Sequence, residues 1–560
     1  MNVSQSRTRF HEWLVAGVFC VFFFFYKLAG FGLVGADEPR FAQIGREMLA
    51  RHDWVSPTLY GGVWLEKPVL YYWSAMVSYR VFGVSDWSAR FPVAVFASLM
   101  VAAMYLFMRR FRPGTELPAV LITCSSAAIV SFARSGSTDM PLAACFTIGL
   151  LGWLAWFETG EKKWLLVFYF FTAAGMLAKG PVAPLLAGLI IVCFALLRRD
   201  LRLVLRTLWI PGILVFLLTA MPWYVLVQLR NPQFFTEFIL RQNLARFGTN
   251  LYHHEQPFWY YIPVLLLGAF PWTLFLLAAL VQIVRTWKRA DAPGRPAPDD
   301  LEKFLVVWAI LPILFFSFSQ SKLPGYILPT MPAWLLLTVL YFARMAAART
   351  RSYALWLAHA LGIGAFIVLV FFAPAIVLHP HEMPASHLLL PAVVAAALAA
   401  MMAALISWRG WQTLVAGTLC VSVVAAGLLL RTTAPVIDAV QSARPVAAYL
   451  GNVTEPVVVF QVGRGIQYGL GFYFNRATPS YDAGNFQQQD HFLITKKNNL
   501  AELVPFMQQH KLVGSNNRKC PLQSVLRPDH AFHSPAFDLY YVSAECAPES
   551  AAGGLSLGKK

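Results

Sequence analysis

The chain has few charged residues for its length. Only 13% of its 560 residues are Asp, Glu, Lys or Arg, whereas soluble globular proteins carry about 25%. In their place stand hydrophobic residues, which make up 58% of the sequence and give a mean hydropathy of +0.56. This composition excludes an ordinary soluble domain and predicts a polytopic α-helical membrane protein.

A long basic stretch interleaved with aromatic residues is also missing, although the formal net charge is +17. The Arg and Lys residues cluster in short loops between apolar runs, where they set the orientation of a membrane protein. We therefore expect membrane lipids, and no nucleic acid, among the partners of this chain.

Several familiar motifs are absent. The apolar run after the basic residues 1–12 lacks a small-residue cleavage site, so we expect an uncleaved first span. The segment VGRGIQYG at 462–469 has G-x-G-x-x-x-G spacing, which is not the dinucleotide fingerprint. No Ser-His-Asp or Cys-His arrangement can be recognised from the spacing of these residues.

Cysteines are few and mostly apolar in context. Five of the seven lie in apolar runs and are expected to be packing residues: Cys20, Cys124, Cys145, Cys193 and Cys420. Cys520 and Cys546 lie in the polar C-terminal region. A disulfide between these two would be compatible with a location outside the cytoplasm.

Apolar runs of about 20 residues predict membrane spans. Thirteen such runs are present, at 13–35, 91–108, 116–133, 141–157, 164–178, 181–197, 207–229, 258–284, 303–320, 326–343, 354–378, 388–407 and 411–430. If the N-terminus lies inside, every cytoplasmic loop carries Arg or Lys, as the positive-inside rule requires. An odd number of spans then places the C-terminus outside.

Three outer segments are too long to be simple connectors. We expect a transmembrane domain over 1–433 with outer loops at 36–90 and 230–257, an α/β domain over 434–548, and a flexible tail over 549–560. Amphipathic patterns predict three interfacial helices in the loops. The apolar stripe of the first helix is Phe41, Ile44, Met48 and Leu49, and that of the second is Leu70, Trp73, Val77 and Val81. The third helix is expected in the segment NPQFFTEFILRQNLARF at 231–247.

The C-terminal region alternates between strand and helix patterns. Four segments are typical of strands, namely EPVVVFQVG, ATPSYDA, HFLITKK and DLYYVS, and helices are expected at about 438–450 and 499–510. Together they predict a small α/β domain.

The segment GADEPRF at 35–41 places two carboxylates and an arginine where the first span ends. One interpretation is that Asp37 caps a helix that starts at Pro39, because Asp is a good N-cap and Pro suits a first turn. The other unusual ionisable residues are predicted at the same outer face. They are Glu66 and Lys67 in WLEKP, Asp139 in RSGSTDMP, Lys179 in MLAKGP, Lys322 with Tyr326 in SKLPGYILP, and Arg241, Arg246, His253 and His254 in the second outer loop.

The several cations predicted at the outer face indicate an anion-binding site. Lys67 is expected at the start of a helix, where a cation opposes the helix dipole and a bound phosphate would reverse the balance. Snorkelling is the alternative for Lys179 and Lys322. Two adjacent histidines with Glu66 or Glu255 could bind a divalent ion, but they lack the i, i+4 spacing of a helical metal site, so we expect no required metal.

The segments GADEPRFAQIGREML, GGVWLEKPVLYYW and SKLPGYILP resemble the lipid A aminoarabinose transferases of Gram-negative bacteria. These belong to the GT-C class of polyprenyl-phosphate-dependent glycosyltransferases and are related to protein O-mannosyltransferases. The resemblance implies transfer of 4-amino-4-deoxy-L-arabinose from undecaprenyl phosphate to lipid A phosphates at the periplasmic face of the inner membrane. Resistance to polymyxin and cationic peptides would follow. It implies no cofactor, and we expect a monomer.

Roles for the outer residues follow from this resemblance and from the charge of a phosphate leaving group. Asp37 and Glu66 are expected to be catalytic. Phosphate binding is assigned to Arg40, Lys67, Lys179, Arg241, Arg246, Lys322 and Tyr326, and substrate positioning to Glu38, Asp139, His253 and His254.

Three alternatives stay open at this point. The first is a relative that glycosylates protein or another lipid, with Asp37 as a true general base. The second is a lipid transporter, although the charges gather at one face rather than at the midplane. The third makes region 434–548 a module that recruits a partner.

Overall fold

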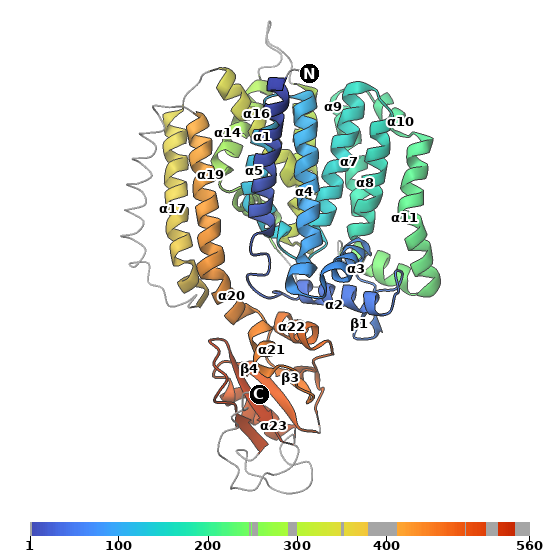
Figure 1. Ribbon diagram of the computed structural model, residues 1–560. Coiled ribbons are helices and arrows are strands. Elements are labelled where there is room, and N and C mark those ends of the chain that lie inside the picture. The colour runs from blue at the N-terminus through green and yellow to red at the C-terminus, as the bar shows by residue number, and fades with distance from the viewer. Residues whose placement is uncertain are drawn as a thin grey trace.

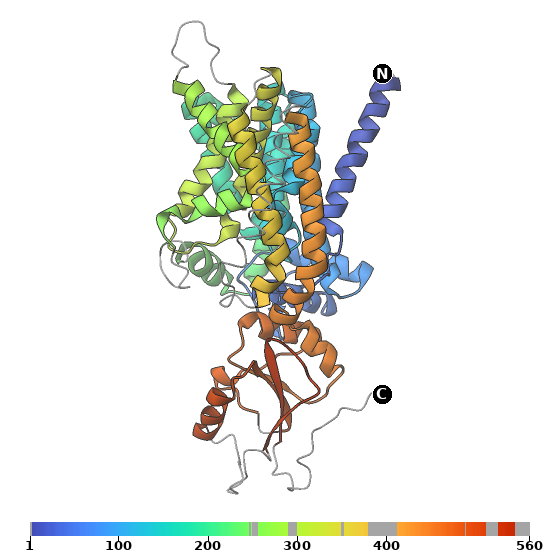
Figure 2. The same cartoon turned by 90° about the vertical axis from the view of Figure 1, so that its left-hand side faces the viewer.

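Long helices form a bundle, and the C-terminal region with its β-sheet extends from one end of it (Figure 1). The computed structural model describes residues 3–245, 248, 256–288, 299–348, 352–378, 411–487, 489–510 and 525–543. Helix α1 (Val3–Cys20) begins at the end of the bundle away from the C-terminal region, as Figures 1 and 2 both show.

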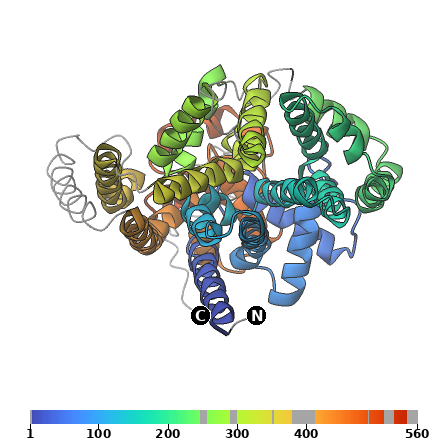
Figure 3. The same ribbon diagram turned by 90° about the horizontal axis from the view of Figure 1, so that it is seen from above.

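Helices occupy twelve of the thirteen predicted spans, and the span at 388–407 lies outside the described residues. After α1 the bundle contains α4 (Asp86–Phe111), α5 (Glu116–Ser125), α6 (Ala127–Ala133), α7 (Asp139–Thr159), α8 (Lys163–Lys179), α9 (Val182–Leu197), α10 (Arg202–Thr207), α11 (Ile210–Arg230), α13 (Tyr261–Gly268), α14 (Thr273–Lys288), α15 (Asp300–Ser317), α16 (Met331–Ala347), α17 (Tyr353–Leu378) and α19 (Trp411–Leu428). Seen from above, the yellow-brown helices α17 and α19 lie at one edge and the green α11 at the opposite edge (Figure 3).

Within the described residues, six helices are long and apolar enough to cross a membrane, or up to eight if each bent pair is one span. The polytopic helical architecture is thus confirmed, whereas the number thirteen is not. Two predicted spans are broken. Helices α5 and α6 form an angle of 68°, and the segment Phe258–Gly268, which contains α13, forms an angle of 118° with α14.

The two breaks satisfy each other's polar groups. The backbone N–H of Ala127 donates to the carbonyl of Phe270 at 2.8 Å, and the indole N–H of Trp272 donates to the Ser125 hydroxyl at 2.9 Å. Backbone groups freed inside a membrane protein need such partners, because lipid offers none. The hydropathy of these segments contains no sign of this pairing.

Helix α2 (Asp37–Ala50) lies next to the C-terminal region, and α3 (Leu70–Phe82) packs against α2 (Figure 1). The stripe Phe41, Ile44 and Met48 of α2 is buried, and the ring of Phe41 lies 6.1 Å from that of Tyr72 in α3. Val77 and Val81 of α3 are instead 54% and 66% exposed. The α2 stripe is therefore mostly buried, whereas the C-terminal half of the α3 stripe faces outward.

Two predicted helix starts are wrong. Helix α2 begins at Asp37 and has Ala36 as its N-cap; the Asp37 carboxylate pairs with Arg40 one turn later instead of capping. Helix α3 begins at Leu70, so Lys67 precedes the helix and does not lie in its first turn. The segment before α3 forms a short antiparallel hairpin, β1 (Thr58–Leu59) with β2 (Gly62–Val63), that the sequence does not predict.

The third predicted interfacial helix is present as a π-helix, η2 (Phe235–Ala245). The first predicted span, 13–35, ends earlier than expected. Helix α1 passes into the π-helix η1 (Val21–Phe25), and the helical segment ends there. Beyond it, Arg134 donates to the carbonyls of Phe23, Tyr26 and Lys27 at 2.9 to 3.2 Å. These contacts satisfy carbonyls that the ending helix leaves unpaired.

The C-terminal region contains a four-stranded sheet in the order β3-β4-β6-β5. Its strands are β3 (Val457–Phe460), β4 (His491–Lys496), β5 (Leu526–Pro528) and β6 (Phe537–Val542), and only the β3–β4 pair is parallel. Helices α21 (Arg444–Leu450), α22 (Arg464–Phe474) and α23 (Leu500–Gln509) accompany it. The strand predicted at 477–483 is wrong, since it contains a single bridge at Ser480 and the 3-10 turn η6 (Tyr481–Ala483).

Helix α22 packs closely along α2, and its glycines permit this. A Cβ on Gly465 would lie 3.0 Å from the backbone of Gly35, and the Tyr60 hydroxyl fills the space that a Cβ on Gly471 would need. Within VGRGIQYG, Gly465 therefore permits the close approach to Gly35, and Gly469 permits one to Ala443, whereas Gly463 has open space beside it. Packing thus explains the glycines at 465 and 469 of this segment, whose spacing does not match the nucleotide-binding pattern.

An ion-pair network joins the C-terminal region to the outer loop. Arg444 contacts Asp438 of α20 (Ala434–Gln441) at 2.7 Å and Asp86 at 3.1 Å. Tyr473 donates to Asp86 at 2.8 Å, and the N–H of Gly32 donates to Asp438 at 2.7 Å. The C-terminal region is thus attached through directional contacts to the segment that precedes α2.

A buried ion pair holds that segment in place. Arg90 of α4 is fully buried and uses all five of its N–H groups. Its Nε and one Nη donate to Glu38 at 2.6 and 2.8 Å, and its remaining hydrogen bonds reach the carbonyls of Leu28, Phe31 and Gly32. Glu38 also accepts the N–H groups of Val34 and Gly136.

We predict that Glu38→Gln or Arg90→Met destabilises the protein by about 3–5 kcal/mol, because removing one partner leaves an uncompensated buried charge. Thermal unfolding in detergent would measure the change. The control is Arg80→Gln, which alters an exposed arginine of α3. Equal melting temperatures for the Arg90→Met variant and the wild type would contradict the structural role of the pair.

Candidate active site

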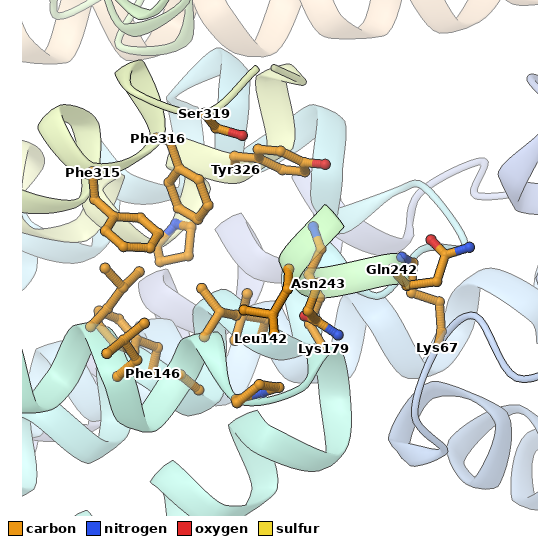
Figure 4. Close-up of a pocket in the computed structure, with 17 residues that line it drawn as sticks. Lys67, Leu142, Phe146, Lys179, Gln242, Asn243, Phe315, Phe316, Ser319 and Tyr326 are labelled. Carbon is orange, nitrogen blue, oxygen red and sulfur yellow. The ribbon is translucent and has the colours of Figure 1, made fainter. Parts of the chain in front are cut away.

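An amphipathic cavity of about 240 Å³ lies between α7, α9, α15, η2 and the 3-10 helix η4 (Pro324–Thr330). The rings of Phe146, Phe315 and Phe316 line one side of it, and the side chains of Lys67 and Lys179 lie on the other (Figure 4). One end of the cavity is thus apolar, and the other carries two ammonium groups.

Lys179 and Asp139 form an ion pair at the polar end. Asp139 is the first residue of α7 and Lys179 the last of α8, so both charges complement the helix dipoles. The Lys179 Nζ also lies 4.9 Å from the centre of the Tyr326 ring, within cation–π range.

Gly325 allows Tyr326 to reach this pair. A Cβ on Gly325 would lie 2.7 Å from the carboxyl carbon of Asp139, which is too close for any other residue without rearrangement. Three predicted site segments, RSGSTDMP, MLAKGP and SKLPGYILP, therefore meet at one point.

Lys67 reaches the same cavity from the outer loop, beside Gln242 of η2 (Figure 4). Its neighbour Glu66 lies 3.9 Å from Arg40. The segment WLEKP thus connects the cavity to the charged residues at the start of α2.

Arg40 lies between two carboxylates. It pairs with Asp37, approaches Glu66, and stacks over Trp64 at 4.9 Å and over Tyr468 of α22 at 5.6 Å. Burial favours the neutral form of Arg40, but Asp37 and Glu66 outweigh it and raise the pKa of this side chain. Asp37 itself remains 59% exposed, so its carboxylate is accessible to a substrate.

Glu38 has a different environment from Asp37. Its side chain is 3% exposed and is held by Arg90, Val34 and Gly136. The contact with Gly136 at 2.7 Å brings the start of α2 against the loop that precedes Asp139. Glu38 therefore positions its neighbours through the backbone.

Lys322 and Arg241 do not line the cavity. Lys322 is 7% exposed and donates to the carbonyl of Ser319 at 2.6 Å, so it supports the wall from behind. Arg241 is 57% exposed and pairs with Glu237 at 3.3 Å. The residues after it, Gln242 and Asn243, line the cavity instead.

Some predicted residues lie outside the described part of the chain: Arg246, His253, His254, Cys520 and Cys546. Among the residues that are described, no group of three or more His, Cys, Asp or Glu side chains is placed to hold a metal ion.

Sequence reasoning missed several residues that complete the site. They are Arg90, Gln242, Asn243, Ser319, Tyr468 and the aromatic wall of Phe146, Phe315 and Phe316. The only signal for Gln242 and Asn243 is the amide pair that follows Arg241 in the third interfacial segment. Arg90 could have been noticed as a cation at the edge of an apolar run.

Comparisons with known proteins agree with the motif resemblance. The dolichyl-phosphate-mannose-protein mannosyltransferase family matches residues 66–225. The chain is 32% identical over 341 residues to undecaprenyl phosphate-alpha-4-amino-4-deoxy-L-arabinose arabinosyl transferase 1 of Pseudomonas fluorescens, which covers 59% of this chain and 60% of that relative. It is 32% identical over 319 residues to the corresponding transferase of Pseudomonas aeruginosa, covering 55% of each. The matched regions thus span about 55–60% of these relatives' own length.

Solved structures extend the likeness to the whole fold. The crystal structure of ArnT from Cupriavidus metallidurans bound to undecaprenyl phosphate matches with a TM-score of 0.71 and 24% identity, over 96% of this chain and 99% of that one. The predicted resemblance is confirmed: this chain has the polytopic helical GT-C fold of ArnT and is similar in sequence to the undecaprenyl phosphate-aminoarabinose arabinosyl transferases.

Proposed function

We propose that this protein is a membrane glycosyltransferase that moves 4-amino-4-deoxy-L-arabinose from undecaprenyl phosphate to phosphate groups of lipid A. The amphipathic cavity carries this proposal. Its aromatic and aliphatic walls suit a polyprenyl chain, and its two lysines suit the phosphate that such a chain bears. Modified lipid A would expose fewer negative charges, which accounts for resistance to polymyxin and other cationic peptides.

In this mechanism an oxygen of the acceptor phosphate attacks the anomeric carbon of the sugar. The bond from that carbon to the donor phosphate breaks, and undecaprenyl phosphate leaves with the electron pair. Lys67 and Lys179 stabilise the charge that develops on the leaving phosphate, and the Tyr326 hydroxyl can donate a further hydrogen bond. We expect an oxocarbenium-like transition state and inversion at the sugar carbon.

In this mechanism Asp139 fixes the position of the Lys179 ammonium group. The ion pair holds the ammonium group at the cavity while the site is empty. An incoming phosphate shares that ammonium group, so Asp139 acts as a positioning residue. The arrangement keeps the half-buried ammonium group paired with an anion both before and after the phosphate binds.

Asp37 takes a role that depends on the acceptor. A lipid A phosphate is already ionised near neutral pH and needs no base, so Asp37 and Glu66 orient the acceptor or hold the ammonium group of the sugar. A hydroxyl acceptor on a protein or another lipid would need Asp37 as general base. The ion pair of Asp37 with Arg40 occupies the carboxylate with a cation, which favours the first role.

The orientation in the membrane is part of the proposal. Arg109 and Arg110 end α4, and Arg198 and Arg199 follow α9, at the end of the bundle where α1 begins (Figure 1). The positive-inside rule assigns that end to the cytoplasm. Helices α2 and α3, the cavity and the C-terminal region then face the periplasm. We propose that the protein is a monomer of thirteen spans in the inner membrane of a bacterium.

We predict that Asp37→Asn, Glu66→Gln and Lys67→Ala each lower the transferase rate in reconstituted lipid by at least about 100-fold, as loss of one electrostatic stabiliser commonly does. Arg80→Gln is the control. Wild-type rates for all three variants would rule out the site at the start of α2.

The acceptor can be identified in cells. Mass spectrometry of lipid A from cells with and without the protein should show an aminopentose increment that depends on the protein and on Lys179. If lipid A is unmodified but a protein or another lipid gains a sugar, the hydroxyl-acceptor alternative holds. Lipid transport that survives Asp37→Asn would favour a transporter.

We predict that removal of divalent cations with EDTA leaves the transfer rate within about twofold of the untreated rate, because lysines supply the positive charge that a metal would otherwise provide. Loss of activity on chelation, restored by adding back a divalent metal, would contradict this prediction and would favour an ion held by His253 and His254 with Glu66 or Glu255.

A further inference from the structure

A second pocket lies where the C-terminal region meets α2. It has a volume of about 420 Å³ and shares no lining residue with the amphipathic cavity. Three parts of the chain form it: Gln43, Arg46, Glu47, Ala50 and Arg51 of α2; Tyr60 and Gly61 of the hairpin; and Asn475, Arg476 and Ala477 after α22. We refer to it as the α2–α22 pocket.

The α2–α22 pocket has an excess of positive charge. Arg46, Arg51 and Arg476 stand against the single acid Glu47. Glu47 is already engaged, since it accepts hydrogen bonds from Gln43, Thr58 and the N–H groups of Tyr60 and Gly61. Its charge therefore holds the hairpin and does not pair with an arginine.

Two of the arginines have no acidic partner among the residues that the structure describes. Arg46 makes one hydrogen bond, to the carbonyl of Phe472 at 2.9 Å, and Arg476 donates to the carbonyls of Thr454 and Glu455. Burial lowers the pKa of Arg46, as expected for a partly desolvated cation without a carboxylate beside it. A guanidinium offers five donors in a planar fork that matches phosphate, so Arg46 can still bind an anion.

The pocket also holds polar oxygens without partners. The amide oxygen of Gln43 and the hydroxyl of Tyr60 are buried and make no hydrogen bond within the described structure. Leaving such groups unsatisfied costs free energy. An ionised phosphate can accept from the Tyr60 hydroxyl but has no donor for the Gln43 amide oxygen, whereas a sugar hydroxyl can donate to it.

Taken together, these features define a ligand that is both anionic and hydroxylated. We propose that the α2–α22 pocket binds a phosphorylated sugar head group, namely the part of the lipid A acceptor that bears the phosphate not under attack. This inference rests on the proposed function. Arg46 and Arg476 would bind the phosphate, and Gln43 would accept from a sugar hydroxyl.

The position of the pocket supports the assignment. Helix α2 carries Asp37 at its start and Arg46 nine residues later, which separates them by about 14 Å along the helix axis and places them on opposite sides of the helix. Lipid A bears more than one phosphate on its sugar backbone. An acceptor that passes over α2 could present one phosphate at Asp37 and another at Arg46 and Arg476, and the C-terminal region would then take part in acceptor selection.

The test uses the full chain reconstituted in neutral lipid, with bisphosphorylated and monophosphorylated lipid A as acceptors. We expect the double variant Arg46→Gln, Arg476→Gln to raise KM for the bisphosphorylated acceptor about tenfold or more, because charge-assisted hydrogen bonds are lost. Its kcat and its KM for the monophosphorylated acceptor should not change. Arg46→Lys with Arg476→Lys should recover part of the loss, and Arg80→Gln should behave as the wild type.

Competition separates a lipid head group from a small anion. Glucosamine 1-phosphate should compete with the bisphosphorylated acceptor in the wild type more strongly than inorganic phosphate does, and this difference should vanish in the double glutamine variant. Equal inhibition by the two competitors, or an unchanged KM in the double variant, would overturn the inference. An equal loss for both acceptors would also overturn it, because it would indicate a structural defect.

Failure of the proposed function gives a different result. If the wild type transfers no aminoarabinose to any lipid A, direct binding of bisphosphorylated lipid A to the purified protein still tests the pocket. Weaker binding by the double glutamine variant than by Arg80→Gln would support the pocket, and equal binding would refute it.

Discussion

The buried pair of Glu38 and Arg90 is the contact on which the end of the bundle next to the C-terminal region depends. Burying a guanidinium and a carboxylate costs several kcal/mol unless every hydrogen-bonding group is satisfied. Here the five donors of Arg90 are all used, and Glu38 accepts two further backbone N–H groups. The pair thereby joins the end of the first span, the start of α2, the first turns of α4 and the loop before α7.

The candidate active site follows from this junction. Because Glu38 is held to Gly136, the start of α2 lies against the loop that leads to Asp139. Asp139 in turn pairs with Lys179, and the absence of a side chain at Gly325 lets Tyr326 pack against the pair. Glu38 and Asp37 are adjacent in sequence, yet one supports the fold and the other faces the solvent.

The same junction extends to the C-terminal region. Gly32, whose carbonyl Arg90 binds, donates its N–H to Asp438, and Asp438 pairs with Arg444. Helix α22 then lies along α2 and brings Tyr468 to Arg40 and Arg476 to the α2–α22 pocket. The C-terminal region therefore contributes side chains next to the candidate site.

Hydropathy and the basic loops were enough to predict a polytopic helical protein and most helix positions, since these properties depend on local composition. They also predicted that Asp37, Lys67, Lys179 and Tyr326 lie at one end of the bundle. The motifs GADEPRF, WLEKP and SKLPGYILP also indicated the correct relatives. Only the tertiary structure decided that α5–α6 and α13–α14 are bent. It also decided that Glu38 is buried while Asp37 is exposed, and that Gln242 lines the cavity while Arg241 does not. Each of these depends on partners distant in sequence, such as Phe270 for Ala127 and Arg90 for Glu38. A local pattern states what a segment can form, but the partner that satisfies a buried polar group is chosen by the packing of the whole chain.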